Sequence, residues 1–145
     1  MITVEVNQRA GKKIPVTFWH SRAKKISRGL GLRRQCRVSL AIVGPVVMQH
    51  LNKTYRGKNQ PTNVLSFSEA EVVDRSARLA TSDLGEVVIC YQQAVAEANQ
   101  LGRTVAQQLE FLFIHGVLHL LGYDHQTKRQ ATVMERLEQK VINQA

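Results

Sequence analysis

The sequence predicts an α+β protein in which a mixed four-stranded sheet packs on a central helix. Its 145 residues suit one domain, and we expect residues 1–145 to form it. Four short runs rich in β-branched residues are interspersed with four or five segments of helical periodicity. One of these segments is apolar nearly all round, which is typical of the most buried helix of a domain.

The N-terminal half is expected to supply two strands and two helices. Residues 2–6 alternate between apolar and polar side chains, as in a half-buried strand. The helix that follows starts at a proline, repeats apolar residues at helical spacing and ends at glycines: Pro15, Val16, Trp19, Ala23, Ile26, Gly29 and Gly31. Residues 36–43 are predicted to form a buried strand. Gly44-Pro45 then starts a helix that runs to about residue 53.

The middle of the chain is predicted to add two short strands. A polar loop over residues 52–63 leads to a strand at residues 64–67. Residues 69–82 have no clear period and are expected to form a loop. Residues 85–90 form the fourth strand, which is followed by a helix over residues 91–101.

The segment from Thr104 to Leu121 gives the strongest helix prediction. Thr104 suits the N-cap position, and Gly122 suits the residue at which the chain leaves the helix. Its apolar residues recur at helical spacing and predict the central, buried helix: Val105, Leu109, Leu112, Phe113, Val117, Leu120 and Leu121. A last amphipathic helix is expected over residues 127–143, with an apolar face made of Val133, Met134, Leu137 and Val141.

The composition excludes several classes of protein. Hydrophobic residues make up 43% and charged residues 21%, which is ordinary for a globular domain rather than a disordered, collagen-like or coiled-coil chain. No apolar run approaches the roughly 20 residues of a membrane span, and the first residues lack the apolar core of a signal peptide. Cys36 and Cys90 are too few for a disulfide framework and fit buried packing. We therefore expect a soluble, cytoplasmic protein with no membrane partner.

The charge is distributed unevenly along the chain. Residues 1–60 hold 13 basic residues and one acidic residue, a net charge of +12, whereas residues 61–145 have a net charge of −3. This asymmetry favours a polyanionic partner, most simply nucleic acid, with an anionic membrane surface as the weaker alternative. The candidate contacts to phosphate are Lys24, Lys25, Arg28, Arg33, Arg34 and Arg37.

Three of the five histidines lie within the string HGVLHLLGYDH, residues 115–125. His115 and His119 lie one turn apart on one face of the predicted helix. Gly122 allows the chain to turn back and bring His125 to the same point. Three imidazoles with a fourth position for water are the ligand set of a catalytic zinc site. The sequence therefore predicts one Zn²⁺ ion on these three histidines and a water, although imidazole also suits nickel, copper and iron.

The spacing matches the pattern H-E-x-x-H-x-x-G-x-x-H of metzincin peptidases, with one difference. Gly116 stands where those enzymes carry the glutamate that acts as general base, which argues against a peptidase. A glycine beside the metal is also expected to leave room for a bulky substrate. Asp124 either orients a histidine ring or is a surface turn residue, and Tyr123 is expected to pack.

The histidine string and two segments upstream of it resemble the YbeY family of bacterial endoribonucleases. These segments are LNKTYRGKNQPTNVLSF, residues 51–67, and LGEVVIC, residues 84–90. The resemblance implies a zincin-like fold and a single-strand-specific, zinc-dependent endoribonuclease. It implies action in 16S rRNA 3′-end maturation and ribosome quality control, with RNA and the small ribosomal subunit as partners. It also implies zinc on His115, His119 and His125, and a catalytic role for Arg56 and for His115.

The chain departs from the usual family pattern at four positions. Where the family reads PTDVLSFP, this chain has Asn63 in place of the aspartate and Ser68 in place of the last proline. Asn59 and Glu86 also stand where aspartate is common. The two asparagines remove two carboxylates near the expected site, which argues against a role for these positions as general base or as partners of the metal ligands, and the identity of the general base stays open. The three imidazoles and Arg56 are intact.

Arg56 can present a planar fork to two phosphate oxygens, although on its own it also fits an exposed surface arginine. Two other functions stay open. One is a different metal hydrolase such as a peptidase, which Gly116 and the basic half disfavour. The other is a non-catalytic, rRNA-binding assembly factor in which zinc only stabilises the fold. A fourth protein ligand, either Asp124 or a cysteine, would indicate such a structural zinc.

Overall fold

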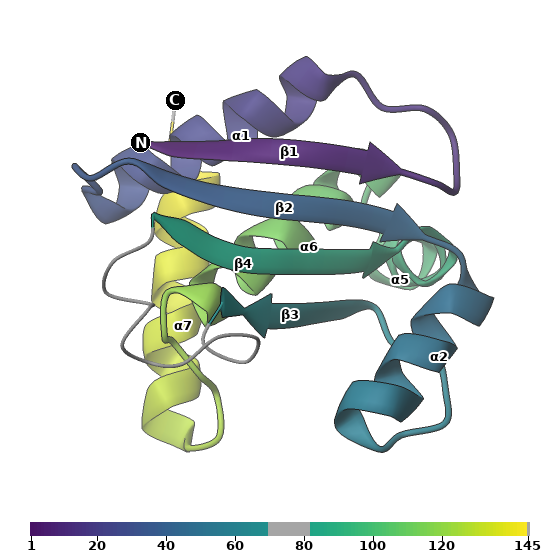
Figure 1. Ribbon diagram of the computed structural model, residues 1–145. Helices are drawn as coiled ribbons and strands as arrows, with labels where there is room; N and C mark the ends of the chain where they lie inside the picture. Colours follow the sequence, from purple (N-terminus) through teal and green to yellow (C-terminus); the bar gives the residue numbers. More distant parts are fainter. Residues whose placement is uncertain (70–81, 145) are drawn as a thin grey trace.

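The computed structural model describes residues 1–69 and 82–144, and its elements follow the predicted order (Figure 1). The strands are β1 (Ile2–Gln8), β2 (Cys36–Val43), β3 (Val64–Ser68) and β4 (Asp83–Cys90). The helices are α1 (Val16–Leu30), α2 (Pro45–Arg56), α5 (Tyr91–Leu101), α6 (Val105–Leu120) and α7 (Lys128–Ile142). Most of the loop predicted over residues 69–82 lies outside the described residues.

The four strands form one mixed sheet, as predicted, and the structure shows their order to be β1-β2-β4-β3. β1 and β4 both run parallel to β2, whereas β3 runs antiparallel to β4. The N–H of Cys90 donates to the carbonyl oxygen of Asn63. Because hydrogen-bonded and non-hydrogen-bonded pairs alternate along an antiparallel ladder, the backbone groups of Val64, Ser66 and Ser68 point to the outer edge of β3.

The alternation of side chains gives the sheet two covered faces. One face packs on α1, α5, α6 and α7, with α6 at the centre (Figure 1). Trp19 of α1 is fully buried there and packs edge-to-face on Phe113 of α6, with ring centroids 5.4 Å apart. The other face carries a smaller cluster beneath α2: Val43, Met48, Leu65, Val88 and Cys90. Cys36 and Cys90 are both buried and unpaired, which confirms their prediction as packing residues.

The largest difference from the predicted elements concerns α2. This helix continues to Arg56 and ends at Gly57, whose φ of 73° is left-handed. The predicted polar loop therefore starts later than residue 52. Asn52 is buried within the helix, where its side-chain amide donates to the carbonyl of Gln60 at 2.8 Å. Asn52 thus stabilises the loop that follows the helix. Because the prediction relied on polarity alone, it placed the end of the helix too early.

Three smaller corrections concern the faces of helices. The sequence places Val16 and Val133 on the apolar faces of their helices. In the structure they are 51% and 43% exposed and lie outside the core. Gly29 is buried inside α1, and Gly31 is the C-cap that ends the helix.

No helix among the described residues is long and apolar enough to cross a membrane.

Candidate metal centre

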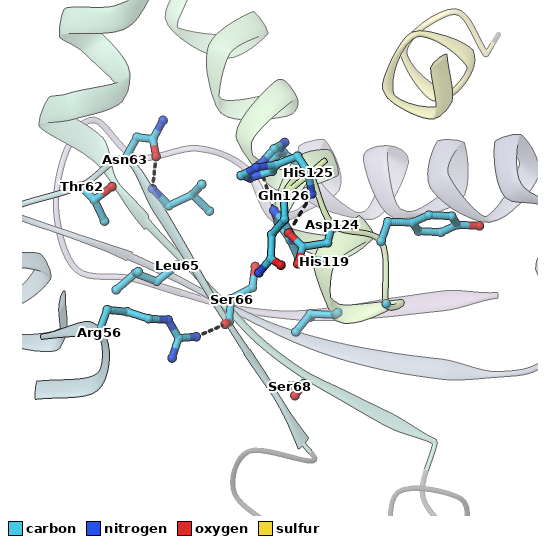
Figure 2. A pocket seen from close by; sticks show the side chains of 15 residues that line it. Arg56, Thr62, Asn63, Leu65, Ser66, Ser68, His119, Asp124, His125 and Gln126 are labelled. Carbon is cyan, nitrogen blue, oxygen red and sulfur yellow. Dashed lines mark hydrogen bonds between the residues drawn. The ribbon is translucent and has the colours of Figure 1, made fainter. Parts of the chain in front are cut away.

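The C-terminal turns of α6 and the loop after it bring three imidazoles together. His115 and His119 lie one turn apart on α6, with their Nε2 atoms 3.1 Å apart. His125 follows in the loop, and one ligand nitrogen from each of the three rings lies within 4.8 Å of the others. The two helical histidines are half-buried, and His125 is exposed. Figure 2 shows His119 and His125 from close by, at the pocket that they line. This geometry suits one metal ion, as the spacing predicted.

The turn after α6 determines where His125 lies. Gly122 adopts a φ of 102°, which residues with a Cβ rarely adopt. The N–H of Tyr123 donates back to the carbonyl of Leu118 at 3.0 Å. One oxygen of the half-buried Asp124 carboxylate accepts the backbone N–H of His125 at 2.7 Å. Of the two interpretations of Asp124, this contact supports the turn residue, because it fixes the backbone of a candidate ligand rather than a ring.

Glu138 of α7 is a site residue that the sequence prediction missed. Its Oε1 lies 2.9 Å from Nδ1 of His115, and its side chain is only 7% exposed. A signal was present in the sequence: Glu138 lies four residues after Met134 and three before Val141, both of which belong to the buried face of the helix. A charged residue at such a position requires a buried partner.

The surroundings of His119 favour a neutral ring. Burial lowers the pKa of His119 below its ordinary value, and the neighbouring His115 and His125 lower it further. Asp124 opposes this shift. Because only a neutral imidazole has a lone pair to offer a metal, the donor set fits a zinc ion.

The histidines form one side of a pocket of about 650 Å³, and Arg56 lies on the other (Figure 2). Arg56 is the last residue of α2, and its Nη2 donates to the edge carbonyl of Ser66 at 2.8 Å. Its guanidinium carbon lies 4.9 Å from the centre of the Phe67 ring. The structure thus brings Arg56, which is 59 residues or more from the histidines in sequence, to the same pocket.

Gly116 faces the sheet rather than the pocket. A Cβ at this position would lie 2.7 Å from a methyl group of Val87 and 3.2 Å from the hydroxyl of Ser66. That hydroxyl donates to the Gly116 carbonyl at 2.9 Å. The glycine therefore allows close packing of α6 on β3 and β4, which corrects the expectation that it makes room for substrate. Among the described residues that line the pocket, Asp124 is the only carboxylate.

The structure shows the surroundings of three of the four positions that depart from the family pattern. The amide of Asn63 donates to Glu97 of α5 at 3.3 Å, and its oxygen accepts the N–H of Val64 at 2.7 Å. The oxygen of Asn59 accepts from Gln49 at 3.1 Å. Glu86 is exposed on β4 opposite Phe67. Asn63 lines the pocket, and within the described part of the chain no hydrogen bond or ion pair joins any of the three positions to a histidine of the cluster.

The basic residues predicted to contact phosphate lie away from this pocket. Lys25 pairs with Glu110 at 2.9 Å, and Arg37 pairs with Asp83 at 3.2 Å. Lys24, Arg28, Arg33, Arg34 and the paired Arg37 are exposed. The first four lie on α1 and in the loop before β2, and α1 runs along β1, the strand farthest from β3 (Figure 1).

Comparison with known proteins gives a consistent match. A sequence model of the family described as Endoribonuclease YbeY matches residues 4–145. The protein named Endoribonuclease YbeY from Paramagnetospirillum magneticum is 41% identical over 110 residues, which are 72% of this chain and 65% of that protein. The protein of the same name from Legionella pneumophila is 34% identical over 142 residues, 96% of this chain and 87% of that protein.

A solved structure shares the fold. The solution structure of TM1509 from Thermotoga maritima aligns with a TM-score of 0.60 at 22% identity, covering 97% of this chain and 89% of that one. At this level of identity the likeness concerns the fold, and it agrees with the mixed sheet and central helix described above.

Proposed function

The chain belongs to the YbeY family of endoribonucleases and is an RNA-cleaving hydrolase; we propose that it uses one zinc ion to cleave single-stranded RNA. We further propose that its substrate is the 3′ end of 16S rRNA on the small ribosomal subunit, that this cleavage serves rRNA maturation and ribosome quality control, and that it acts in the cytoplasm. The observation that carries the proposal is one pocket that joins three converging imidazoles to an arginine.

The zinc ion is assigned to His115, His119 and His125. When bound, zinc supplies a Lewis acid for phosphoryl oxygens and brings the pKa of a water to about 7. Structural zinc sites are closed by four protein ligands, whereas catalytic sites use three. Among the described residues the candidate cluster has three members and borders an open pocket. This supports catalysis over a zinc that only stabilises an assembly factor.

Arg56 is assigned to the scissile phosphate. Its planar guanidinium can donate to two phosphate oxygens at once, which stabilises the charge that develops at phosphorus. The bond to the Ser66 carbonyl and the contact with the Phe67 ring hold this side chain at the pocket wall. Lys53 and Lys58 are exposed on the same segment and extend the positive charge along it.

The test is cleavage of a labelled single-stranded fragment from the 3′ end of 16S rRNA, with the bound metal quantified in each sample. The wild type should cleave this fragment and spare a duplex of the same sequence. Arg56→Ala should keep its metal and lose at least about 100-fold in rate. His115→Ala should lose both metal and activity.

Arg103→Ala is the matched control. Arg103 also lies over an aromatic ring, Phe111, and also donates a hydrogen bond, to Gln108, but it does not line the pocket. This variant should cleave like the wild type. Equal trace activity in all four proteins would indicate contamination and would favour the non-catalytic assembly factor.

A further inference from the structure

Two glutamates are the buried acidic residues among those described, and they have different partners. Glu110 is 8% exposed and is neutralised by Arg22 and Lys25 at 3.2 and 2.9 Å. Counted over the whole residue, Glu138 is 5% exposed, and its partner in the structure is the His115 ring at 2.9 Å. A buried carboxylate is costly unless it is hydrogen-bonded or paired, so the contact with the ring compensates for the burial of Glu138.

We infer that Glu138 is a positioning residue that fixes the tautomer and the orientation of His115 for the metal. An ionised carboxylate can only accept hydrogen bonds, so Nδ1 of His115 must carry the proton of this contact. The lone pair of the ring then lies on Nε2. That atom is 3.1 Å from Nε2 of His119, the neighbouring candidate ligand. The inference rests on the proposed metal site.

The carboxylate comes from an element that is independently anchored. Met134 and Val141 of α7 are 1% and 0% exposed and belong to the main core. Glu138 lies between them on the same face and therefore has little freedom to move. A carboxylate fixed by core packing orients a ring more strongly than a mobile, exposed carboxylate, because the packing has already restricted its side-chain conformation. Docking of α7 on α6 thus sets the direction of the first ligand.

Two variants and one control test this role. Glu138→Leu keeps a side chain of similar size but has no hydrogen-bond acceptor for Nδ1 of His115. Glu138→Gln keeps a carbonyl oxygen that can still accept from Nδ1. Glu110→Gln is the control, because it removes a second buried carboxylate that contacts no histidine. Circular dichroism and thermal unfolding show whether each variant folds.

Zinc affinity, measured by competition with a chromophoric chelator, is the first readout. Glu138→Leu should lose about 10–100-fold in affinity, Glu138→Gln should retain part of it, and Glu110→Gln should match the wild type. The cobalt-substituted proteins should differ in the same order in their visible spectra. Equal affinities and spectra in the wild type and both Glu138 variants would overturn the inference while leaving the proposed function intact.

The ring tautomer in the zinc-free protein is the second readout. Long-range ¹H–¹⁵N spectra should show His115 protonated on Nδ1 in the wild type and in Glu110→Gln. In Glu138→Leu the ring should populate both tautomers. A wild type that takes up no zinc would refute the proposed function. Even then, the tautomer of His115 in the zinc-free protein would show whether Glu138 orients the ring. His115 protonated on Nε2 in the wild type would overturn the inference.

Discussion

The absence of a side chain at residue 116 determines how closely α6 approaches the sheet. The φ of Gly116 is not positive, so glycine is not needed there for backbone conformation. It is needed for space, because a Cβ would lie 2.7 Å from a methyl group of Val87. His115 and His119 lie on either side of it in sequence. The packing of this residue therefore sets the height of both imidazoles above β3.

Gly116→Ala should destabilise the protein by about 1–3 kcal/mol, because the added methyl group forces α6 away from β4. Urea unfolding measures this loss. The double variant Gly116→Ala/Val87→Ala should recover part of it, since alanine at residue 87 removes the methyl groups that collide. Val87→Ala alone should cost stability by leaving a cavity. Strictly additive costs in the double variant would refute this account.

At the scale of elements, α6 and α7 begin in the same way. Thr104 and Thr127 each accept the N–H of the glutamine three residues later, and that glutamine side chain accepts the N–H of the threonine. This reciprocal capping box satisfies two of the backbone donors that a helix start leaves unpaired. Both helices that supply the candidate metal centre therefore have fixed first turns.

Thr127→Ala should lower the free energy of unfolding by about 0.5–2 kcal/mol, because the cap of α7 is lost. Thr132→Ala is the control on the same helix. Thr132 is exposed, and its hydroxyl donates to the carbonyl of Lys128 one turn earlier. Alanine there should be neutral within about 0.5 kcal/mol. Equal effects at the two positions would show that the cap contributes nothing of its own.

At the scale of the whole molecule, the core and the candidate metal centre are separate. Both faces of the sheet are covered by buried apolar residues that include none of the three histidines. The histidines lie at the rim, with His125 exposed. The fold is therefore expected to persist without metal, unlike that of small zinc domains whose core is the site itself.

Removal of metal with a chelator should abolish RNA cleavage and leave the far-ultraviolet circular dichroism spectrum unchanged. The melting temperature should fall modestly, because only the binding free energy of the ion is lost. Added zinc should restore cleavage. Unfolding upon chelation would instead assign zinc a structural role and would favour the assembly factor.

The uneven charge also acts over the whole molecule. Arg33 and Arg34 lie before β2, at the end of the sheet where Arg37 pairs with Asp83 and Gly85 with Ser68. An RNA strand that reaches them from the pocket must cross from β3 past β4 to β2. The basic residues would thus bind the backbone of the substrate at a distance from the cleaved bond.

The double variant Arg33→Glu/Arg34→Glu should weaken binding of single-stranded RNA without loss of zinc. The slope of the logarithm of affinity against that of salt concentration should decrease by about 1.4, as for two lost phosphate contacts. Arg136→Glu/Lys140→Glu, on the exposed side of α7, makes the same change in net charge and is the control. Equal weakening in both variants would show an effect of net charge alone, and unchanged binding would exclude these arginines from the path.

The sequence by itself determined the fold class, the order of the elements and the three converging histidines. These features depend on local rules: apolar periodicity, prolines and glycines at element ends, and a spacing of four residues on one helix face. The glycine turn after α6 is equally local. For this reason the position of His125 followed from the sequence.

Only the tertiary structure decided which distant residues meet. It placed Glu138 on His115, Arg56 on the edge of β3, and Val87 against Gly116. In the structure the basic residues of α1 and of the loop before β2 lie away from the pocket. The polar segment over residues 52–63, predicted as one loop, is divided between α2 and the loop after it. Each of these outcomes depends on contacts between elements far apart in the chain. The helical spacing can indicate that a polar residue such as Glu138 is buried, but only the packing of distant elements decides which partner that residue meets.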